Sequence, residues 1–152
     1  MAEKIKVIIN NRQAFRDFHI DDTYEAGLEL FGNEVKSLRG GNANLKGSFA
    51  KVEKGQVYIY NMHITPYEFS REETDPVRPR KLLLHKTQIR QIEVKLLQKG
   101  FSLIPIKAYF KRGYAKVELG IGRGKKLYDK RHDIKKKQAD REMQKALRHR
   151  NR

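Results

Sequence analysis

The sequence predicts a mainly β protein, namely an OB-like antiparallel β-barrel of about six strands with two or three short helices and a basic C-terminal tail. Apolar residues alternate with polar residues in several short segments, and Gly-containing tripeptides separate two pairs of these segments. Neither a strand–helix–strand alternation nor an internal repeat is evident. A closed or partly closed barrel is the most economical way to bury the single apolar face of each strand.

Two strands are expected near the N-terminus, followed by a helix. Ile5, Val7 and Ile9 alternate in the first strand. A long second strand begins at Phe18, and its apolar face uses even-numbered positions; these are Ile20, Tyr24, Ala26, Leu28 and Leu30. In "FGNEVKSLRGG" the period changes, because Phe31, Val35 and Leu38 are spaced as i, i+4 and i+7. This spacing predicts a short helix that Gly40 and Gly41 end.

The central third of the chain predicts a hairpin and a long loop. Residues 47–53 and 56–62 read as strands with the turn "EKG" between them. Residues 64–81 contain three of the four prolines and many charges, which favours a loop.

The clearest helix is "KTQIRQIEVKLLQKG", with Thr87 as its cap and Gly100 as its stop; its apolar side carries Ile89, Ile92, Leu96 and Leu97. Two last strands, residues 101–110 and 114–121, meet at the turn "KRG". Pro105 lies in the first of these strands and predicts an edge strand or a bulge there, because proline cannot donate a ladder hydrogen bond.

The charge is concentrated at the C-terminal end. The 152 residues carry a net charge of +16, with 34% charged and 38% hydrophobic residues. From Gly124 to Arg152 there are twelve Lys or Arg and four Asp or Glu, a net +8 and so half of the excess. The expected organisation is a barrel over residues 1–123 and a tail over residues 124–152. Asp133 could cap a helix that runs to about Arg148, with an apolar stripe of Ala139, Met143, Ala146 and Leu147. Because this stripe is thin, the tail is expected to be disordered when free and helical only when bound.

The amino-acid composition indicates the kind of partner and the cellular compartment of the protein. So large a positive charge favours polyanions, of which phosphate backbones are the commonest. Cysteine is absent, which excludes disulfides, thiol catalysis and Cys-based metal sites. The start of the chain has only a short apolar run, and no window is long and apolar enough to span a membrane. A cytoplasmic protein is expected, and self-repulsion favours a monomer.

Patterns for catalysis are weak. The five histidines include no pair at i, i+3 or i, i+4, so no metal site is predicted. "RHD" (Arg131 to Asp133) has the residue types of a nuclease acid–base pair but stands in the charged tail. "GIGRGKK" fails the phosphate-loop pattern, since Lys126 occupies the Ser/Thr position. Its glycines are expected to let the chain leave the barrel or to let its backbone approach a phosphate.

Three stretches have the residue types of nucleic-acid contacts. "GNEVKSLRGGNANLKG" presents Lys36 and Arg39 on a helix and the amides of Asn42 and Asn44 after it. An ordinary capped helix and turn is an equally good interpretation, with Glu34 favouring the helix N-terminus.

"RPRKLLLHK" offers cations for phosphates and two side chains for bases; these are Arg78, Arg80, Lys81 and Lys86, with Leu83 and His85. A charged loop that leads into a core strand is the alternative interpretation. The third stretch is the tail, which is expected to order on a polyanion, or else to serve only as a solubilising segment.

Four fragments together resemble one protein family. "GLELFGNEVKSLRGGNANL", "ITPY", "RPRKLLLHK" and "GIGRGKKLYDKRHDIKKK", in this order, are similar to the small protein B family, bacterial proteins that bind transfer-messenger RNA. The similarity runs from about Phe18 to Lys137. The resemblance implies an OB-type barrel that binds the tRNA-like part of transfer-messenger RNA and delivers it to stalled ribosomes. It also implies trans-translation without any covalent chemistry by the protein, no cofactor, and indirect contact with alanyl-tRNA synthetase and elongation factor Tu through the RNA.

The same resemblance implies roles for matching positions. Those that would face transfer-messenger RNA are Glu34, Lys36, Arg39, Asn42, Leu83 and His85. Those that would engage the decoding region of 16S ribosomal RNA are Gly124, Lys125, Lys126, Tyr128, Asp129, Lys130 and Arg131. The later part of the tail would lie in the empty mRNA channel; it begins with Asp133, Ile134, Lys135, Lys136 and Lys137.

Other functions remain open at this stage. A general ribosome-binding or single-strand RNA-binding OB protein would show little preference for a tRNA-like RNA. A membrane-associated basic protein is disfavoured by the lack of bulky apolar residues in the tail. A nuclease would need RNA degradation by the pure protein.

Overall fold

The computed structural model describes residues 5–68, 74–125 and 137–146. Its elements are β1 (Ile5–Asn10), α1 (Arg12–Asp17), β2 (Phe18–Leu28), α2 (Gly32–Arg39), β3 (Ala43–Asn44), β4 (Phe49–Glu53), β5 (Gln56–Tyr60), β6 (His63–Ile64), β7 (Arg80–Leu83), α3 (Lys86–Leu96), β8 (Phe101–Lys111) and β9 (Tyr114–Gly124). Residues 137–146 form a further helix, all of whose residues are exposed.

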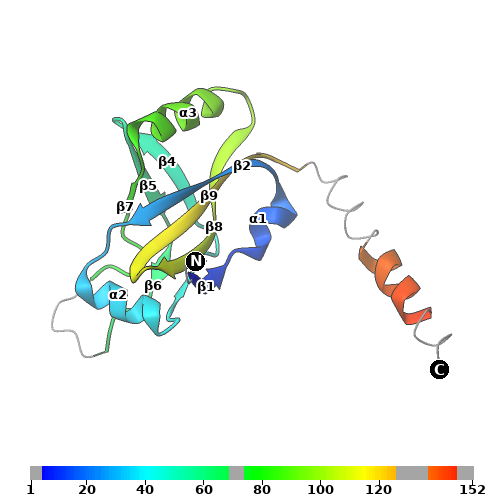
Figure 1. Ribbon diagram of the computed structural model, residues 1–152, viewed down its shortest axis with the longest axis horizontal. Helices are drawn as coiled ribbons and strands as arrows, with labels where there is room; N and C mark the ends of the chain where they lie inside the picture. Colours follow the sequence, from blue (N-terminus) through cyan, green and yellow to red (C-terminus); the bar gives the residue numbers. More distant parts are fainter. Residues whose placement is uncertain (1–4, 69–73, 126–136, 147–152) are drawn as a thin grey trace.

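Seven strands form one antiparallel sheet that closes on itself. The strand order is β1-β8-β4-β5-β7-β2-β9, and β8 also pairs with β9. Six strands therefore make a ring, to which β1 adds as a seventh strand along the second half of β8. Figure 1 shows α2 and α3 at opposite ends of this ring and α1 beside it. The predicted mainly β, OB-like architecture is confirmed.

The core fills the ring with aliphatic side chains. Its fully buried members include Val57 and Ile59 of β5, Leu82 of β7 and Leu119 of β9. In β5 and β7 the buried residues alternate with half-buried or exposed neighbours, as expected for strands that have one face in a core. The inward face of β7 thus contributes to the core, as the interpretation of "RPRKLLLHK" as a charged loop that leads into a core strand implied.

Two hairpins have the predicted turns. Lys54 and Gly55 join β4 to β5 with φ values of 50° and 74°. Arg112 and Gly113 join β8 to β9 with φ values of 52° and 79°. Two-residue loops with positive φ at both positions match the twist of the flanking strands, which explains the glycine in each second position.

Three features differ from the sequence-based expectation, and the structure decides between two alternatives at Pro105. Residues 12–17 form α1, which was not expected, and β7 begins at Arg80, inside the loop that was expected over residues 64–81. Short strands β3 and β6 were not expected. The strand over 101–110 is not at an edge, because β8 pairs with three strands; the alternative of a bulge is confirmed by the register shift between Pro105 and Lys107.

Two helix assignments also need correction. The N-cap of α3 is His85 and not Thr87, and Gln88 accepts a hydrogen bond from the His85 N–H at 3.2 Å. Ile89 and Ile92 are buried as predicted, but Leu97 lies past the helix end and is 86% exposed. At α2, Leu38 is buried whereas Phe31 stands at the N-cap and is 54% exposed.

Two glycines of the "GIGRG" segment, Gly120 and Gly122, pack inside the sheet. The glycines were expected to let the chain leave the barrel or to let its backbone approach a phosphate; Gly120 and Gly122 lie within β9, which ends at Gly124. A Cβ at Gly122 would lie 2.2 Å from the carbonyl oxygen of His19, and one at Gly120 would lie 2.7 Å from the Ile106 side chain. The two glycines therefore allow β2, β8 and β9 to approach closely, next to the bulge between Ile20 and Asp22.

Candidate nucleic-acid interface

The interface begins with α2, an eight-residue helix with one buried side. Leu38 and Ser37 face the core, while Lys36 and Arg39 are exposed. The Glu34 carboxylate accepts the N–H of Phe31 at 2.9 Å, which satisfies one of the free donors at the helix N-terminus. The buried side and the Glu34 hydrogen bond therefore hold α2 in an orientation that leaves Lys36 and Arg39 exposed to solvent.

Glu34 is the centre of a buried charge cluster. Its carboxylate accepts hydrogen bonds from Nη2 of Arg78 at 2.5 Å and from Nε of Arg80 at 2.7 Å. Arg80 also donates to the carbonyl oxygens of Met62 at 2.6 Å and Pro76 at 3.0 Å. Exposed fractions are 3% for the Glu34 side chain and 0% for the Arg80 side chain. The cluster ties α2 to β7 and to the chain before it.

Both members of the pair have shifted pKa values. Burial opposes ionisation of Glu34, but the hydrogen bonds from Arg78, from the Phe31 N–H and from Arg80 outweigh it and hold the pKa of the carboxyl below its usual value. Burial lowers the pKa of Arg80, and the hydrogen bond to Glu34 partly offsets this. An arginine remains charged despite such a shift, so the pair is an ion pair at neutral pH.

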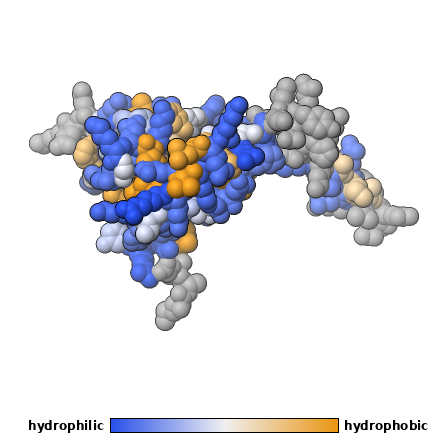
Figure 2. All heavy atoms as spheres, turned by 90° about the horizontal axis from the view of Figure 1, so that it is seen from above, coloured by the Kyte–Doolittle hydropathy of each residue, from blue (hydrophilic) through white to orange (hydrophobic). Residues whose placement is uncertain are grey.

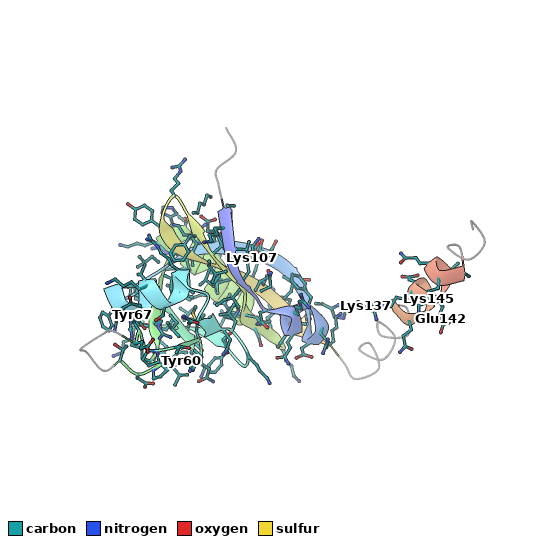
Figure 3. The ribbon with its side chains drawn as sticks, turned by 90° about the horizontal axis from the view of Figure 1, so that it is seen from below. Tyr60, Tyr67, Lys107, Lys137, Glu142 and Lys145 are labelled. Atoms are coloured by element: carbon teal, nitrogen blue, oxygen red, sulfur yellow. The ribbon has the colours of Figure 1, made fainter. Side chains whose placement is uncertain are left out.

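The turn after α2 is held by backbone pairing. The Thr65 N–H donates to the Asn42 carbonyl at 2.8 Å, and β3 pairs with β6 through Ala43↔Ile64 and Asn44↔His63. Both Asn42 and Asn44 are exposed. Lys36 lies with its Nζ 5.4 Å from the centroid of the Tyr67 ring, and Figure 3 shows Tyr67 beside α2. Lys36, Arg39, Asn42 and Asn44 thus belong to one end of the ring.

The residues of "RPRKLLLHK" divide between two faces. Because β7 is a strand, Arg80 and Leu82 point inward, and Lys81 and Leu83 point outward. The Cβ atom of Leu83 would lie 3.2 Å from a Cβ at Gly27, so the glycine of β2 makes room for it. His85 is exposed at the start of α3. The outward residues therefore run along β7 away from α2 and toward the α3 end.

The predicted contacts are thus brought together only in part. Glu34 and Arg80 lie beneath the surface, and the structure gives them a positioning role instead of an open face for phosphates. Lys36, Arg39, Asn42 and Asn44 gather at the α2 end, while Leu83 and His85 lie toward the α3 end, with Lys81 between. Direct RNA contact by these residues stays a prediction.

The start of the tail is anchored to the ring. The Lys125 N–H donates to the carbonyl oxygen of Asp17 at 2.7 Å, and Gly124 pairs with Phe18. The remaining candidates up to Lys136 lie outside the described residues; they are Lys126, Tyr128, Asp129, Lys130, Arg131, Asp133, Ile134, Lys135 and Lys136. Lys137 begins the exposed helix over 137–146, on which Figure 3 labels Glu142 and Lys145 as well.

Sequence reasoning missed an aromatic and basic row on the outer face. Tyr58 of β5 stands between Lys51 of β4 and Lys81 of β7 in the strand register. Phe49 and Tyr60 stack with centroids 5.3 Å apart and an interplanar angle of 12°. Rings and cations together are a common surface for single-stranded RNA. The alternation within "FAKVEKGQVYIY" carried this signal, because the positions between the buried residues hold the rings and lysines.

The described residues lack the features of two other kinds of site. Among residues 5–68, 74–125 and 137–146, no three His, Asp or Glu side chains gather in a way that could hold a metal ion. Within the same ranges, no helix is both long enough and apolar enough to cross a membrane.

The fold and the exposed basic and aromatic residues together define the class of protein. It is a small basic protein with a ring-shaped β-sheet, and its candidate binding site is an exposed surface. Residues 8–149 match the family described as "SmpB protein". The chain belongs to this family. A relative from Syntrophotalea carbinolica, the "SsrA-binding protein", is 54% identical over 147 residues, which cover 96% of this chain and 98% of the relative. The "SsrA-binding protein" of Geobacter sulfurreducens is 55% identical over 144 residues, covering 94% of each chain.

A solved structure agrees with the family assignment. It is described as "tmRNA-SmpB: a journey to the center of the bacterial ribosome" and is 53% identical to this chain. The TM-score is 0.66, and the match covers 78% of this chain and 84% of the other. The sequence resemblance stated above is confirmed.

Proposed function

We propose that this protein binds the tRNA-like part of transfer-messenger RNA and delivers it to stalled ribosomes for trans-translation. The observation that carries the proposal is the family membership, shown over residues 8–149, together with relatives described as SsrA-binding proteins and a similar structure described as tmRNA-SmpB. The net charge of +16 suits two RNA partners, because the counterions that a basic surface releases from RNA favour binding. The protein acts in the cytoplasm and makes or breaks no covalent bond.

The ring binds transfer-messenger RNA, and the tail binds the ribosome. Lys36, Arg39, Asn42 and Asn44 contact transfer-messenger RNA at the α2 end, and Lys81, Leu83 and His85 continue this surface along β7. Glu34 and Arg80 hold α2 and β7 in register beneath it, as their ion pair supports. The tail from Gly124 onward engages the decoding region of 16S ribosomal RNA and then the empty mRNA channel. Intact mRNA competes for that channel, so only a ribosome without mRNA there accepts the tail.

The test compares the full chain with a version that ends at Gly124. Binding to transfer-messenger RNA is measured by titration at two salt concentrations, with an unrelated structured RNA of equal length as the control. Peptide tagging is measured on a message that lacks a stop codon. We expect the shortened chain to bind the RNA with nearly unchanged affinity and to support no tagging. A full chain that binds both RNAs equally would refute the proposal in favour of a general RNA-binding protein.

A further inference from the structure

The ring has a weak seam between β4 and β8. These strands pair through one register position, Ala50↔Leu103, whereas β8 and β9 pair along nearly their whole lengths. A groove of about 720 Å³ lies at this seam. We call it the seam groove; its apolar lining includes Phe49, Leu96, Leu97, Phe101 and Leu103. Figure 2, which views the α3 end of the molecule, shows hydrophobic residues gathered within a hydrophilic surround.

An aromatic ring with a cation above it stands on each strand that borders the groove. On β4, the Nζ of Lys51 lies 5.3 Å from the centroid of Phe49. Phe101 of β8 has its ring centroid 4.7 Å from the guanidinium carbon of Arg123, which belongs to the neighbouring strand β9. A ring offers a face for a base, and a neighbouring cation can reach the adjoining phosphate. The pairing of both features suits a nucleotide better than a purely apolar ligand.

The charge of the groove selects a polyanion over the protein's own tail. Lys51 and Lys54 line it, with Glu93 as the acidic residue among its lining, and Arg123 stands next to it. The net +8 of residues 124–152 would be repelled by such a rim, whereas a phosphate backbone is attracted. Leu97 is 86% exposed at the mouth of the groove, an apolar side chain available for contact with a base.

The position of the groove indicates which RNA it meets. Phe101 is the register partner of Arg123, so the groove starts one residue before Gly124, where the proposed ribosome-binding tail begins. The surface proposed for transfer-messenger RNA runs from α2 along β7 to His85 at the start of α3, whereas the groove is lined by the opposite end of that helix, and β7 does not pair with β8. A groove at the root of the tail therefore faces the partner that the tail engages.

We infer that the seam groove receives an unpaired nucleotide of ribosomal RNA, whose base stacks on Phe101 and Leu97 and whose phosphate meets Lys51 and Arg123. The inference rests on the proposed function, because it assigns to the ring a contact with the ribosome beside that of the tail. It adds a base-stacking site on the ring to the charge contacts proposed for the tail.

The first test is Phe101→Leu in the full chain, with Tyr114→Leu as the matched control. Tyr114 is 71% exposed at the far end of the same hairpin, so its loss removes an aromatic ring of similar size away from the groove. Binding of the preformed complex with transfer-messenger RNA to stalled ribosomes is expected to weaken about 5- to 20-fold for Phe101→Leu, the loss of one stacked base. It should stay unchanged for Tyr114→Leu. Equal binding by both variants overturns the inference.

The second test does not depend on the stability of a variant. The exposed Leu97 is replaced by a photoreactive benzophenone amino acid, and the full complex on stalled ribosomes is irradiated. A crosslink to ribosomal RNA supports the inference, and a crosslink to transfer-messenger RNA or to the protein's own tail overturns it. Failure of the proposed function is distinguishable, since the unsubstituted chain would then show no preference for transfer-messenger RNA; the inference would fall with it.

Discussion

Nε of Arg80 lies 2.7 Å from Oε2 of Glu34, and the two side chains, from β7 and α2, are almost fully buried. The ion pair joins positions 46 residues apart in the chain. Between them lies the sequence that contributes β3 to β6 and the loop that follows. The orientation of the helix that presents Lys36 and Arg39 is therefore set by a contact beneath the surface.

Glu34→Gln should destabilise the protein strongly. The substitution leaves the buried Arg80 charge without its carboxylate, and breaking a buried pair from one side costs about 3–5 kcal/mol. We expect a loss of about 3 kcal/mol in the free energy of unfolding, measured by urea titration. The control is Lys107→Gln, which removes the partly exposed pair with Glu118 and should cost less than about 1 kcal/mol. Equal losses for the two variants would contradict the role given to Glu34.

The same pair predicts a pH dependence. The pKa of Glu34 is lower in the folded protein than in the unfolded chain, so its ionisation stabilises the fold above the unfolded value of 4.5. This stability is lost as pH falls from about 4.5 through the folded pKa. The difference in free energy of unfolding between wild type and Glu34→Gln should therefore shrink below pH 4.5. Urea titrations between pH 3 and pH 7 measure it; a difference that is constant or grows on acidification would count against the assigned shift.

Gly122→Ala should open the sheet at the root of the tail. The new Cβ would lie 2.2 Å from the His19 carbonyl oxygen, which is backbone and cannot move aside without separating β2 from β9. Overpacking of this kind costs about 1–3 kcal/mol, so thermal unfolding should shift down by several degrees. Gly124→Ala is the matched control, because nothing lies within 4 Å of its added Cβ. A similar shift for both variants would contradict the close-packing explanation.

Arg39→Gln should weaken binding to transfer-messenger RNA and reduce its salt dependence. If Arg39 contacts one phosphate, the slope of log affinity against log salt should fall by about 1 unit. Arg12→Gln removes the same charge from the exposed start of α1, away from α2, and should leave the slope nearly unchanged. Titrations at four salt concentrations distinguish the two. A loss that is the same for both variants would indicate a purely non-specific charge effect.

Much of the fold could be predicted from the sequence, because short-range patterns decide it. Alternating apolar residues specified β1, β2, β5 and β9, and the Lys54–Gly55 and Arg112–Gly113 turns gave two hairpins. The apolar spacing around Leu38 and Ile92 specified two helices with their buried sides. The net charge and the four motifs also indicated the family and the kind of partner, because both depend only on the order of residues in the sequence.

The tertiary structure decided what depends on distant residues. β7 is short and partly charged, so the sequence offered a core strand there only as one of two interpretations. It forms a strand because it pairs with β5 on one side and β2 on the other. Arg80 reads as a phosphate ligand in sequence but is buried, because Glu34, Met62 and Pro76 supply its hydrogen-bond acceptors from other parts of the chain. The seam groove exists only where β4, α3 and β8 meet. The sequence shows which residues are apolar or charged. Closure of the strands into a ring determines which of these residues are buried and which remain exposed to a partner.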